Sequence, residues 1–321
     1  MKITKLLSAG WLAATVMTMA AHAVYPERPV TLVVPFPPGG STDLVARIVA
    51  TKAQSVLGQA IIVENRGGAG SIIGTNYVAK AAPNGYTLLL GQTACAVNAS
   101  FSKSLPYDTI KDFTPITLLA DHGGIFLAQA QKPYDSFQEF VKYTKANPGK
   151  VVYSSAGVGS WTHLAMEMLA NEVGLSMLHV PYQGTGSGRA DLIAGRVDVV
   201  IAAYATSKGM IQDGSLKVLA VTSEARMPDL PNIPTLAELG YPRYDTSYWM
   251  GILGPAGMSA EVTAKLEKVF IEAVKDPAVA KKLSEQSIRP RGLPASDLSA
   301  LIRKEIEQWA RVIKDANVVS Q

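Results

Sequence analysis

The sequence has little that would support disulfide, metal or nucleic-acid chemistry. Cys95 is the single cysteine among 321 residues, which excludes an internal disulfide. Four histidines are present without an H-E-x-x-H motif, so we predict no metal and no cofactor. Basic residues are scattered without a run of five, which argues against nucleic acid as a partner. Cys95 lies in an apolar stretch and is predicted to be a buried structural thiol.

The common loops for phosphate and for catalytic nucleophiles are also missing. There is no G-x-x-x-x-G-K-[ST], and the Gly-rich stretch Gly68–Gly74 has the spacing G-x-G-x-x-x-G, so we interpret it as a turn that caps a helix. No serine lies in a G-x-S-x-G elbow. Ser160 and His163 could form a pair, but they would point poorly at each other on one helix turn. A secreted Ser/His hydrolase is therefore kept only as an alternative.

The first 23 residues have the pattern of a secretory signal peptide. A short basic start precedes the apolar stretch Leu6–Ala20, and the cleavage-site sequence AHA ends at Ala23. The apolar run is short for a membrane anchor, and no later run reaches 18 uninterrupted apolar residues. We expect export, cleavage after Ala23 and a soluble mature protein.

Apolar, β-branched runs alternate with helical patterns along the remaining chain. This alternation predicts an α/β fold with largely parallel sheets. The expected strands are Val30–Val34, Ala60–Glu64, Tyr86–Leu90, Val151–Tyr153, Met177–Val180, Val197–Ala203 and Leu216–Thr222. The expected helices are Thr42–Leu57, Thr162–Val173, Ser259–Val274 and Ala295–Lys314.

An internal similarity points to two lobes with one ligand between them. VTLVVPFPPGGSTDLVARIV and KVVYSSAGVGSWTHLAMEML each read as a strand, a Gly/Ser turn and an amphipathic helix, with Ser41 and Ser160 at matching positions 119 residues apart. Ligands of open α/β sheets bind beyond the carboxyl ends of strands, so we predict that both turns face the ligand. Two ordinary turns without a shared target are the alternative.

The first of these turns has the chemistry of an anion seat. Gly39, Gly40 and Ser41 lead into a helix N-terminus, whose N–H groups and dipole favour an anion by up to ~2 kcal/mol. A Cβ on the glycines would keep a carboxylate away from the amides. Ser41 and Thr42 add hydroxyl donors, whereas Asp43 would repel an anion and is predicted to support the loop. The second turn offers the same groups from Ser155, Gly157, Gly159 and Ser160.

The crossings between the lobes are predicted from composition. The stretch around Asp121–Gly124 and the Pro-rich, weakly periodic segment Ser223–Tyr248 would carry the chain out and back. Residues 24–124 and 246–321 would then form lobe 1, and residues 125–245 would form lobe 2.

Six motifs follow one another from about Tyr25 to the C-terminus: YPERPVTLVVPFPPGGSTD, IIVENRGGAGSIIG, ANPGKVVYSSAGVGSWTHL, VPYQGTGSGRADLIAGRVDV, LKVLAVTSEAR and PNIPTLAELGYP. The chain thereby resembles the substrate-binding receptors of tripartite tricarboxylate transporters, of the Bug (Bordetella uptake gene) type. The resemblance implies a periplasmic binding protein-like fold, with two α/β lobes joined by a hinge and a ligand cleft between them. It implies a monomeric, non-catalytic receptor that delivers a small organic carboxylate to integral membrane subunits. A ligand-sensing subunit for a membrane kinase is an alternative role.

The resemblance also implies that the two turns hold the carboxylate of the ligand. Phe36 and Trp161 flank the turns and could sandwich a flat ligand, which favours an aromatic mono- or dicarboxylate. Arg66 and Arg189 could pair with a second carboxylate, but we interpret both as structural salt bridges. The predicted ligand-binding set is Phe36, Pro38, Gly39, Gly40, Ser41, Thr42, Gln92, Thr93, Ser155, Gly159, Ser160, Trp161, His163, Tyr182 and Tyr204.

Overall fold

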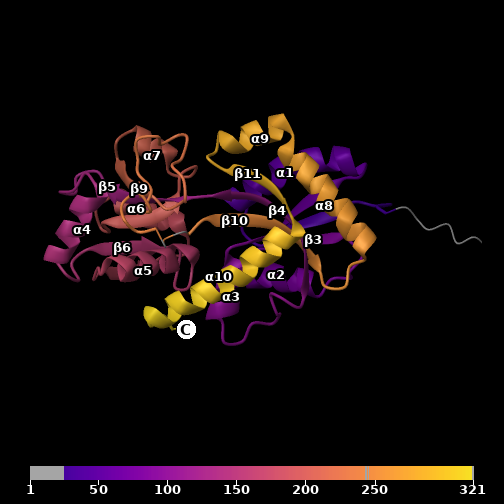
Figure 1. Cartoon of the computed structure of the whole chain (residues 1–321), viewed down its shortest axis with the longest axis horizontal. Coiled ribbons are helices and arrows are strands. Elements are labelled where there is room, and N and C mark those ends of the chain that lie inside the picture. Colours follow the sequence, from indigo (N-terminus) through magenta and orange to yellow (C-terminus); the bar gives the residue numbers. More distant parts are fainter. Residues whose placement is uncertain (1–24, 243, 245, 320–321) are drawn as a thin grey trace, which may run out of the picture.

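The computed structural model describes residues 25–242, 244 and 246–319 and contains two β-sheets, which lie side by side along the longest axis (Figure 1). The first has the strand order β11-β4-β10-β3-β1-β2, and the second has the order β7-β6-β8-β5-β9. The predicted signal peptide and its cleavage site lie outside the described residues. The strands are β1 Val30–Val34, β2 Ile61–Asn65, β3 Thr87–Gln92, β4 Phe113–His122, β5 Gly124–Gln129, β6 Val152–Ser155, β7 Leu178–Pro181, β8 Val199–Ala203, β9 Leu216–Val221, β10 Tyr248–Pro255 and β11 Arg289–Pro294.

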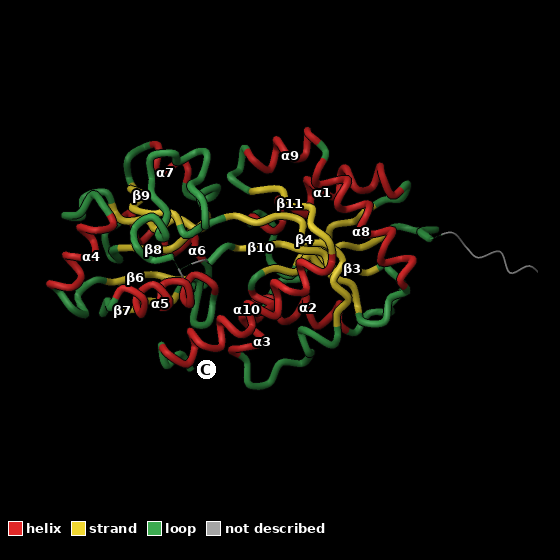
Figure 2. Tube along the Cα trace, in the orientation of Figure 1, coloured by secondary structure: helices red, strands yellow, loops and turns green. Residues whose placement is uncertain are grey.

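Helices pack around both sheets, so each sheet and its helices form one α/β lobe (Figure 2). In the described part of the chain, no helix is both long and apolar enough to cross a bilayer. The helices are α1 Ser41–Leu57, η1 Ala69–Ser71, α2 Ile72–Ala79, α3 Ala94–Phe101, α4 Phe137–Ala146, α5 Trp161–Val173, α6 Thr185–Ile193, α7 Lys208–Gln212, α8 Ala260–Lys275, α9 Pro277–Ser284 and α10 Ala295–Asp315.

The predicted elements are all present, but the sheets are mixed. The seven expected strands and four expected helices correspond to β1, β2, β3, β6, β7, β8, β9, α1, α5, α8 and α10, with ends that differ by at most two residues. The expectation of largely parallel sheets is wrong, because β10 runs antiparallel to β3 and β4, and β5 runs antiparallel to β8 and β9. β4 and β5 carry the chain from the first lobe to the second, and β10 begins after its return. No crossover helix links β4 to β5, so these strands do not follow the parallel βαβ pattern.

The chain passes between the sheets at two places. β4 belongs to the first sheet and ends at His122, and β5 belongs to the second and begins at Gly124, so Gly123 alone separates them. The chain returns between Val221, the end of β9, and Tyr248, the start of β10. The lobe limits at residues 124/125 and 245/246 stay a prediction.

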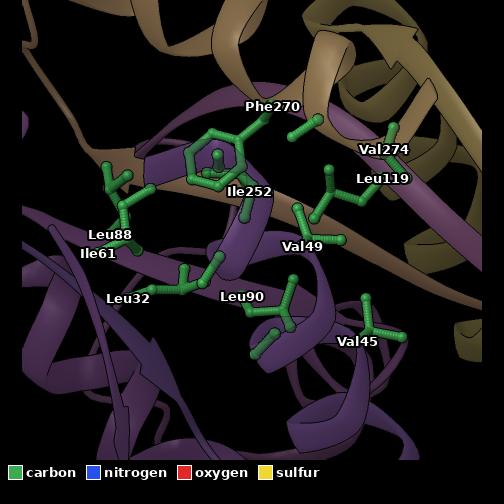
Figure 3. Packing of buried hydrophobic residues seen from close by; sticks show 14 of the residues in the cluster. Leu32, Val45, Val49, Ile61, Leu88, Leu90, Leu119, Ile252, Phe270 and Val274 are labelled. Carbon is green, nitrogen blue, oxygen red and sulfur yellow. The ribbon is translucent and has the colours of Figure 1, made fainter. Parts of the chain in front are cut away.

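The core of the first lobe holds the strand and the helix on either side of the first turn. β1 is buried at four of its five positions, and α1 packs an apolar stripe with Val45 and Val49 onto it. Phe270 and Val274 of α8 complete this layer (Figure 3). Burial of each such side chain contributes about 1.5–3 kcal/mol, so the strand and helix on either side of the first turn are firmly held.

The last helix, α10, starts beside β3 and β4 of the first lobe and runs obliquely towards α5 of the second lobe (Figure 1). It packs against α3 and β4 of the first lobe and against α5 of the second. Near its C-terminal end, the Gln308 Nε2 atom lies 3.7 Å from the Met168 Sδ atom of α5. A single helix therefore contacts both sides of the hinge.

Candidate ligand-binding site

The first turn presents open backbone groups at the N-terminus of α1. Gly40 is the N-cap, and no side chain caps the helix. A Cβ built on Gly39 or Gly40 would meet no heavy atom within 4 Å, so this side of the turn faces open space. Gly39 has a φ of 90°, which a residue with a side chain adopts only with strain. A ligand can therefore approach the first N–H groups of α1 without displacing protein atoms, although the N–H of Gly39 itself is bonded to Asp43.

Asp43 is buried and holds this turn in place. Its Oδ2 atom accepts hydrogen bonds from Gly39 N at 3.0 Å and from Arg47 Nε at 3.1 Å. Its Oδ1 atom accepts from Asn65 Nδ2 at 3.0 Å. Desolvation by itself would raise the pKa of Asp43, but the hydrogen bonds from Arg47, Gly39 and Asn65 outweigh it and lower the pKa. The carboxylate is thus engaged with the loop and its neighbours.

The two serines of the second turn form hydrogen bonds within the second lobe. Ser160 is the N-cap of α5, and its Oγ atom accepts from His163 N at 3.3 Å. Ser155 is fully buried, and its Oγ atom bonds His179 Nε2 at 2.7 Å and accepts from Gly157 N at 3.1 Å. Both hydroxyls are therefore already engaged within the lobe, and direct ligand contacts of either serine stay a prediction.

A stack of aromatic rings lies behind the second turn. His163 and His179 stack at 3.9 Å between ring centroids, and Tyr153 stacks on His179 at 4.7 Å. Desolvation lowers the pKa of both histidines to about 4, and the neighbouring His179 lowers that of His163 further. Both rings are therefore neutral at pH 7. The Nδ1 atom of His163 accepts the Gly159 N–H at 3.1 Å, so this nitrogen is not available as a base for Ser160.

Acidification is expected to destabilise the second lobe as the pH falls from 6.5 towards 4. The folded-state pKa of about 4 for His163 and His179 lies below the usual 6.5, so the unfolded chain takes up protons first. The free energy of unfolding should therefore fall through this window and be unaffected by these groups above it. Urea unfolding followed by circular dichroism at several pH values measures the slope. His163→Gln should flatten it, and an equally steep slope in that variant would contradict the assignment.

Tyr248 brings the two turns together. Its hydroxyl lies 3.3 Å from Thr42 Oγ1, in the first turn of α1. Its ring packs edge-on against Trp161, the first residue of α5, with 5.5 Å between centroids, and stacks on His122 at 5.0 Å. We call Thr42, His122, Trp161 and Tyr248 the junction. It shows that the N-termini of α1 and α5, from different lobes, lie around one side chain.

A second contact between the lobes lies beside the junction. Gly159 has a φ of 73°, and a Cβ built on it would meet the ring of Phe101 at 2.4 Å. Phe101 ends α3 in the first lobe. Glycine is therefore required at this position both by the backbone conformation and by the close approach of the other lobe.

Two junction residues, His122 and Tyr248, were missed by the sequence analysis. Both lie at ends of the crossing strands, where β4 stops and β10 starts, and they pair in register. The available signal was an aromatic residue at each predicted crossing. Turn chemistry alone does not reveal such residues, because they belong to neither turn.

The other predicted residues differ in what they can present to a ligand. Gln92 and Thr93 are buried at the end of β3, where Gln92 Oε1 accepts from Ala94 N at 2.8 Å and Thr93 Oγ1 accepts from Trp249 N at 3.1 Å. Among the described residues, the Gln92 Nε2 atom is buried without a hydrogen-bond partner. The amide nitrogen of Gln92 is thus the group in this pair that a ligand or water could satisfy.

The remaining aromatic residues have structural contacts of their own. Phe36 is half-buried against the first core, and Tyr204 is buried in the core of the second lobe. The Tyr182 hydroxyl donates to Asp191 Oδ2 at 2.6 Å. Pro38 is exposed in the first turn. Ligand contacts from these residues stay predictions.

The two arginines have different environments. Arg66 Nε lies 2.6 Å from Glu64 Oε1, and its guanidinium covers the Tyr77 ring at 3.6 Å, so its interpretation as a structural salt bridge is confirmed. For Arg189 that interpretation is wrong. Its Nη1 atom donates to Thr206 Oγ1 at 3.0 Å, and within the described residues it forms no ion pair. The carboxylate two residues along the same helix, Asp191, pairs with Arg196 instead.

Cys95 is packed in an apolar cluster of the first lobe. Cys95 is a free, buried thiol whose pKa desolvation raises to about 11, as expected for a structural position. No group of three or more His, Cys, Asp or Glu side chains in the described part of the chain is arranged to hold a metal ion.

Two α/β lobes, two crossings and a helix N-terminus from each lobe at the junction define a two-lobed solute-binding protein. The model of the TctC family, the tripartite tricarboxylate transporter family receptor, matches residues 45–318, and the chain belongs to this family of periplasmic binding proteins. It is 37% identical to the "UPF0065 protein in tcbD-tcbE intergenic region" of Pseudomonas sp. (strain P51). The 290 aligned residues make up 90% of this chain and 86% of that relative. It is 35% identical to BugT of Bordetella pertussis over 293 residues, which are 91% of this chain and 90% of BugT.

Solved structures are similar over nearly the whole chain. The periplasmic binding protein BugD is 35% identical with a TM-score of 0.82, over 92% of this chain and 100% of that one. Rpa4515 of R. palustris with adipate is 32% identical with a TM-score of 0.84, over 92% and 99%. MatC of Rhodopseudomonas palustris with bound malate is 31% identical with a TM-score of 0.79, over 90% and 100%. These likenesses establish the periplasmic binding protein fold.

Proposed function

We propose that this chain captures a small organic carboxylate between its lobes and delivers it to the membrane subunits of a tripartite tricarboxylate transporter. The observation that carries the proposal is the junction, where the N-termini of α1 and α5 approach the same Tyr248 side chain. Helix N-termini bind anions through free N–H groups and the helix dipole. Similar proteins that hold adipate and malate support the same ligand class. The receptor acts as a monomer, and residues 1–23 are removed on export to the periplasm.

The available donors are sufficient for useful affinity. Each hydrogen bond to a charged group contributes about 1.5–3 kcal/mol, and a micromolar ligand requires about 8 kcal/mol. Three or four backbone or hydroxyl donors at the first turn and the junction would reach that range. Trp161 is buried in the core of the second lobe and donates its indole N–H to Thr246 O at 3.1 Å, so contact of its ring with an aromatic ligand stays a prediction.

A ligand panel tests the proposal. We expect thermal-shift experiments to show stabilisation by one or more small carboxylates, because a ligand that binds only the folded state raises the unfolding temperature. The panel should contain aliphatic and aromatic mono- and dicarboxylates, amino acids, and uncharged amide analogues as controls. Stabilisation by amides but by none of the carboxylates would refute the carboxylate class. Transport in cells with and without the membrane subunits would then separate delivery from sensing.

A further inference from the structure

Arg189 is a half-buried cation that has no counterion among the described residues. Its Nη1 atom donates to Thr206 Oγ1 at 3.0 Å and to Thr185 Oγ1 at 3.4 Å. Its Nε atom is buried, and no hydrogen-bond partner for it is present among the described residues. Desolvation lowers the pKa of the guanidinium, although it still carries its charge at neutral pH. An unpaired, desolvated charge costs stability, so a structural role does not explain this residue.

The charge lies beside the second turn. α6 begins after Gly184, whose N–H donates to Ala156 O in the second turn at 3.3 Å. The bond to Thr185, the first residue of α6, shows that the Arg189 guanidinium folds back towards this N-terminus. Thr206, its other partner, follows β8, which pairs in parallel with β6, the strand that leads into the second turn. The guanidinium, the start of α6 and the second turn therefore gather at one edge of the second sheet.

The surroundings can accept an anion. The N-terminus of α6 has no side-chain cap, and a Cβ on Gly184 or Gly186 would meet no heavy atom within 4 Å. The nearest carboxylate in the sequence, Asp191, is already bonded to Arg196 and to the Tyr182 hydroxyl. Helix N–H groups and an unpaired guanidinium together form the donor set that carboxylates prefer.

We propose that Arg189, Thr206 and the N-terminus of α6 form a second anion subsite, which holds the distal carboxylate of a ligand whose first carboxylate lies at the junction. The proposal rests on the carboxylate-receptor function and narrows its substrate class to compounds with two anionic groups. The Nη1 atom of Arg189 is bonded to the two threonine hydroxyls, whereas its Nε and Nη2 atoms make no hydrogen bond within the described residues. These two nitrogens can together bind the two oxygens of a planar carboxylate.

Matched ligand pairs test this subsite. Calorimetric affinities are compared for succinate and butyrate, adipate and hexanoate, and terephthalate and benzoate, which differ in one carboxylate. The intact protein should prefer the dicarboxylate of the pair it binds best by about 10- to 100-fold, the value of one charge-assisted contact. Arg189→Met should remove this preference and leave the monocarboxylate affinity within about 2-fold. Arg189→Lys should retain part of it.

The unfolding temperature of Arg189→Met and the affinity of a second variant that lacks a surface charge distinguish a ligand-binding role of Arg189 from a structural one. Arg189→Met should leave the ligand-free unfolding temperature equal or higher, because it removes a desolvated charge. Lys142→Met, which removes one exposed charge from α4 of the same lobe, should change neither affinity. Equal affinity for both members of every pair, or an unchanged preference in Arg189→Met, would overturn the subsite while the receptor function stands. Failure of every carboxylate to bind the intact protein would overturn both.

Discussion

Replacement of Gly40 by leucine is expected to abolish carboxylate binding while the fold stays intact. Gly40 has φ −84° and ψ 172°, a conformation open to any residue, and a Cβ there meets no protein atom within 4 Å. The new side chain would instead occupy the space in front of the first N–H groups of α1. Loss of two hydrogen bonds to a charged group, each about 1.5–3 kcal/mol, corresponds to a weakening of roughly 100-fold or more.

Gly40 is a sharper target than its neighbour. Gly39 has a φ of 90°, so any side chain there would strain the backbone and mix a folding defect with a binding defect. Gly209→Leu in α7 is the matched control, because a Cβ at Gly209 also meets open space and Gly209 belongs to neither turn. Both variants are compared with a monocarboxylate, since Gly209 lies three residues after Thr206 of the proposed second subsite. Calorimetry measures the affinity, and circular dichroism with thermal unfolding checks the fold. Unchanged affinity in Gly40→Leu would remove the first turn from the site.

The local parts of this fold could be predicted from the sequence because their signals are local. The apolar run Val30–Val34, the Gly/Ser turn after it and the stripe on α1 lie within about one strand–helix unit, and the same holds for β6 and α5. Asp43 could also be placed, since its partner Gly39 lies four residues away. Periodicity and turn chemistry determine such units before any tertiary contact forms.

The junction could not be predicted in the same way, because its residues meet only after the chain has crossed twice. Thr42 and Tyr248 are 206 residues apart, and His122 reaches Tyr248 through an antiparallel pairing that the strand–helix pattern does not contain. Arg189 shows the same limit. The sequence contains several acidic residues that could pair with Arg189. Only the folded structure shows that none of the described carboxylates does so.

The hydroxyls of the second turn illustrate a further limit. Ser155 and Ser160 are predicted to bind the ligand because both belong to the second Gly/Ser turn, in which Ser160 matches Ser41 of the first turn. In the structure they bond His179 and the backbone of His163, so much of their hydrogen-bonding capacity is used inside the lobe. Sequence spacing identifies where a hydroxyl lies along a turn, but competition between internal partners and a ligand depends on residues brought there by the fold.

The other large expected effect concerns α10. Trp309→Ala should lower the free energy of unfolding by about 3–5 kcal/mol, the usual cost of deleting a fully buried tryptophan. Trp309 has no exposed surface and belongs to a buried cluster that contains Ala96 of α3 and Leu164 of α5. The indole Nε1 atom also donates to Glu305 Oε2 at 3.3 Å. Urea unfolding followed by circular dichroism at 222 nm measures the change without relying on tryptophan fluorescence.

The reason for a large effect is that Trp309 acts together with Trp249. The Trp249 Nε1 atom donates to the same Glu305 Oε2 atom at 2.8 Å, so one buried carboxylate joins the hinge strand β10 to the helix that reaches the second lobe. Removal of Trp309 leaves a cavity and takes one hydrogen-bond donor from a buried carboxyl group, which adds to the loss of stability. Trp309→Phe keeps most of the volume and should lose less than Trp309→Ala, while Lys304→Ala on the exposed face of α10 should change stability by less than about 0.5 kcal/mol. A loss below about 1 kcal/mol in Trp309→Ala would mean that α10 contacts the second lobe without stabilising it, and the hinge would then depend on the two crossings and the junction alone.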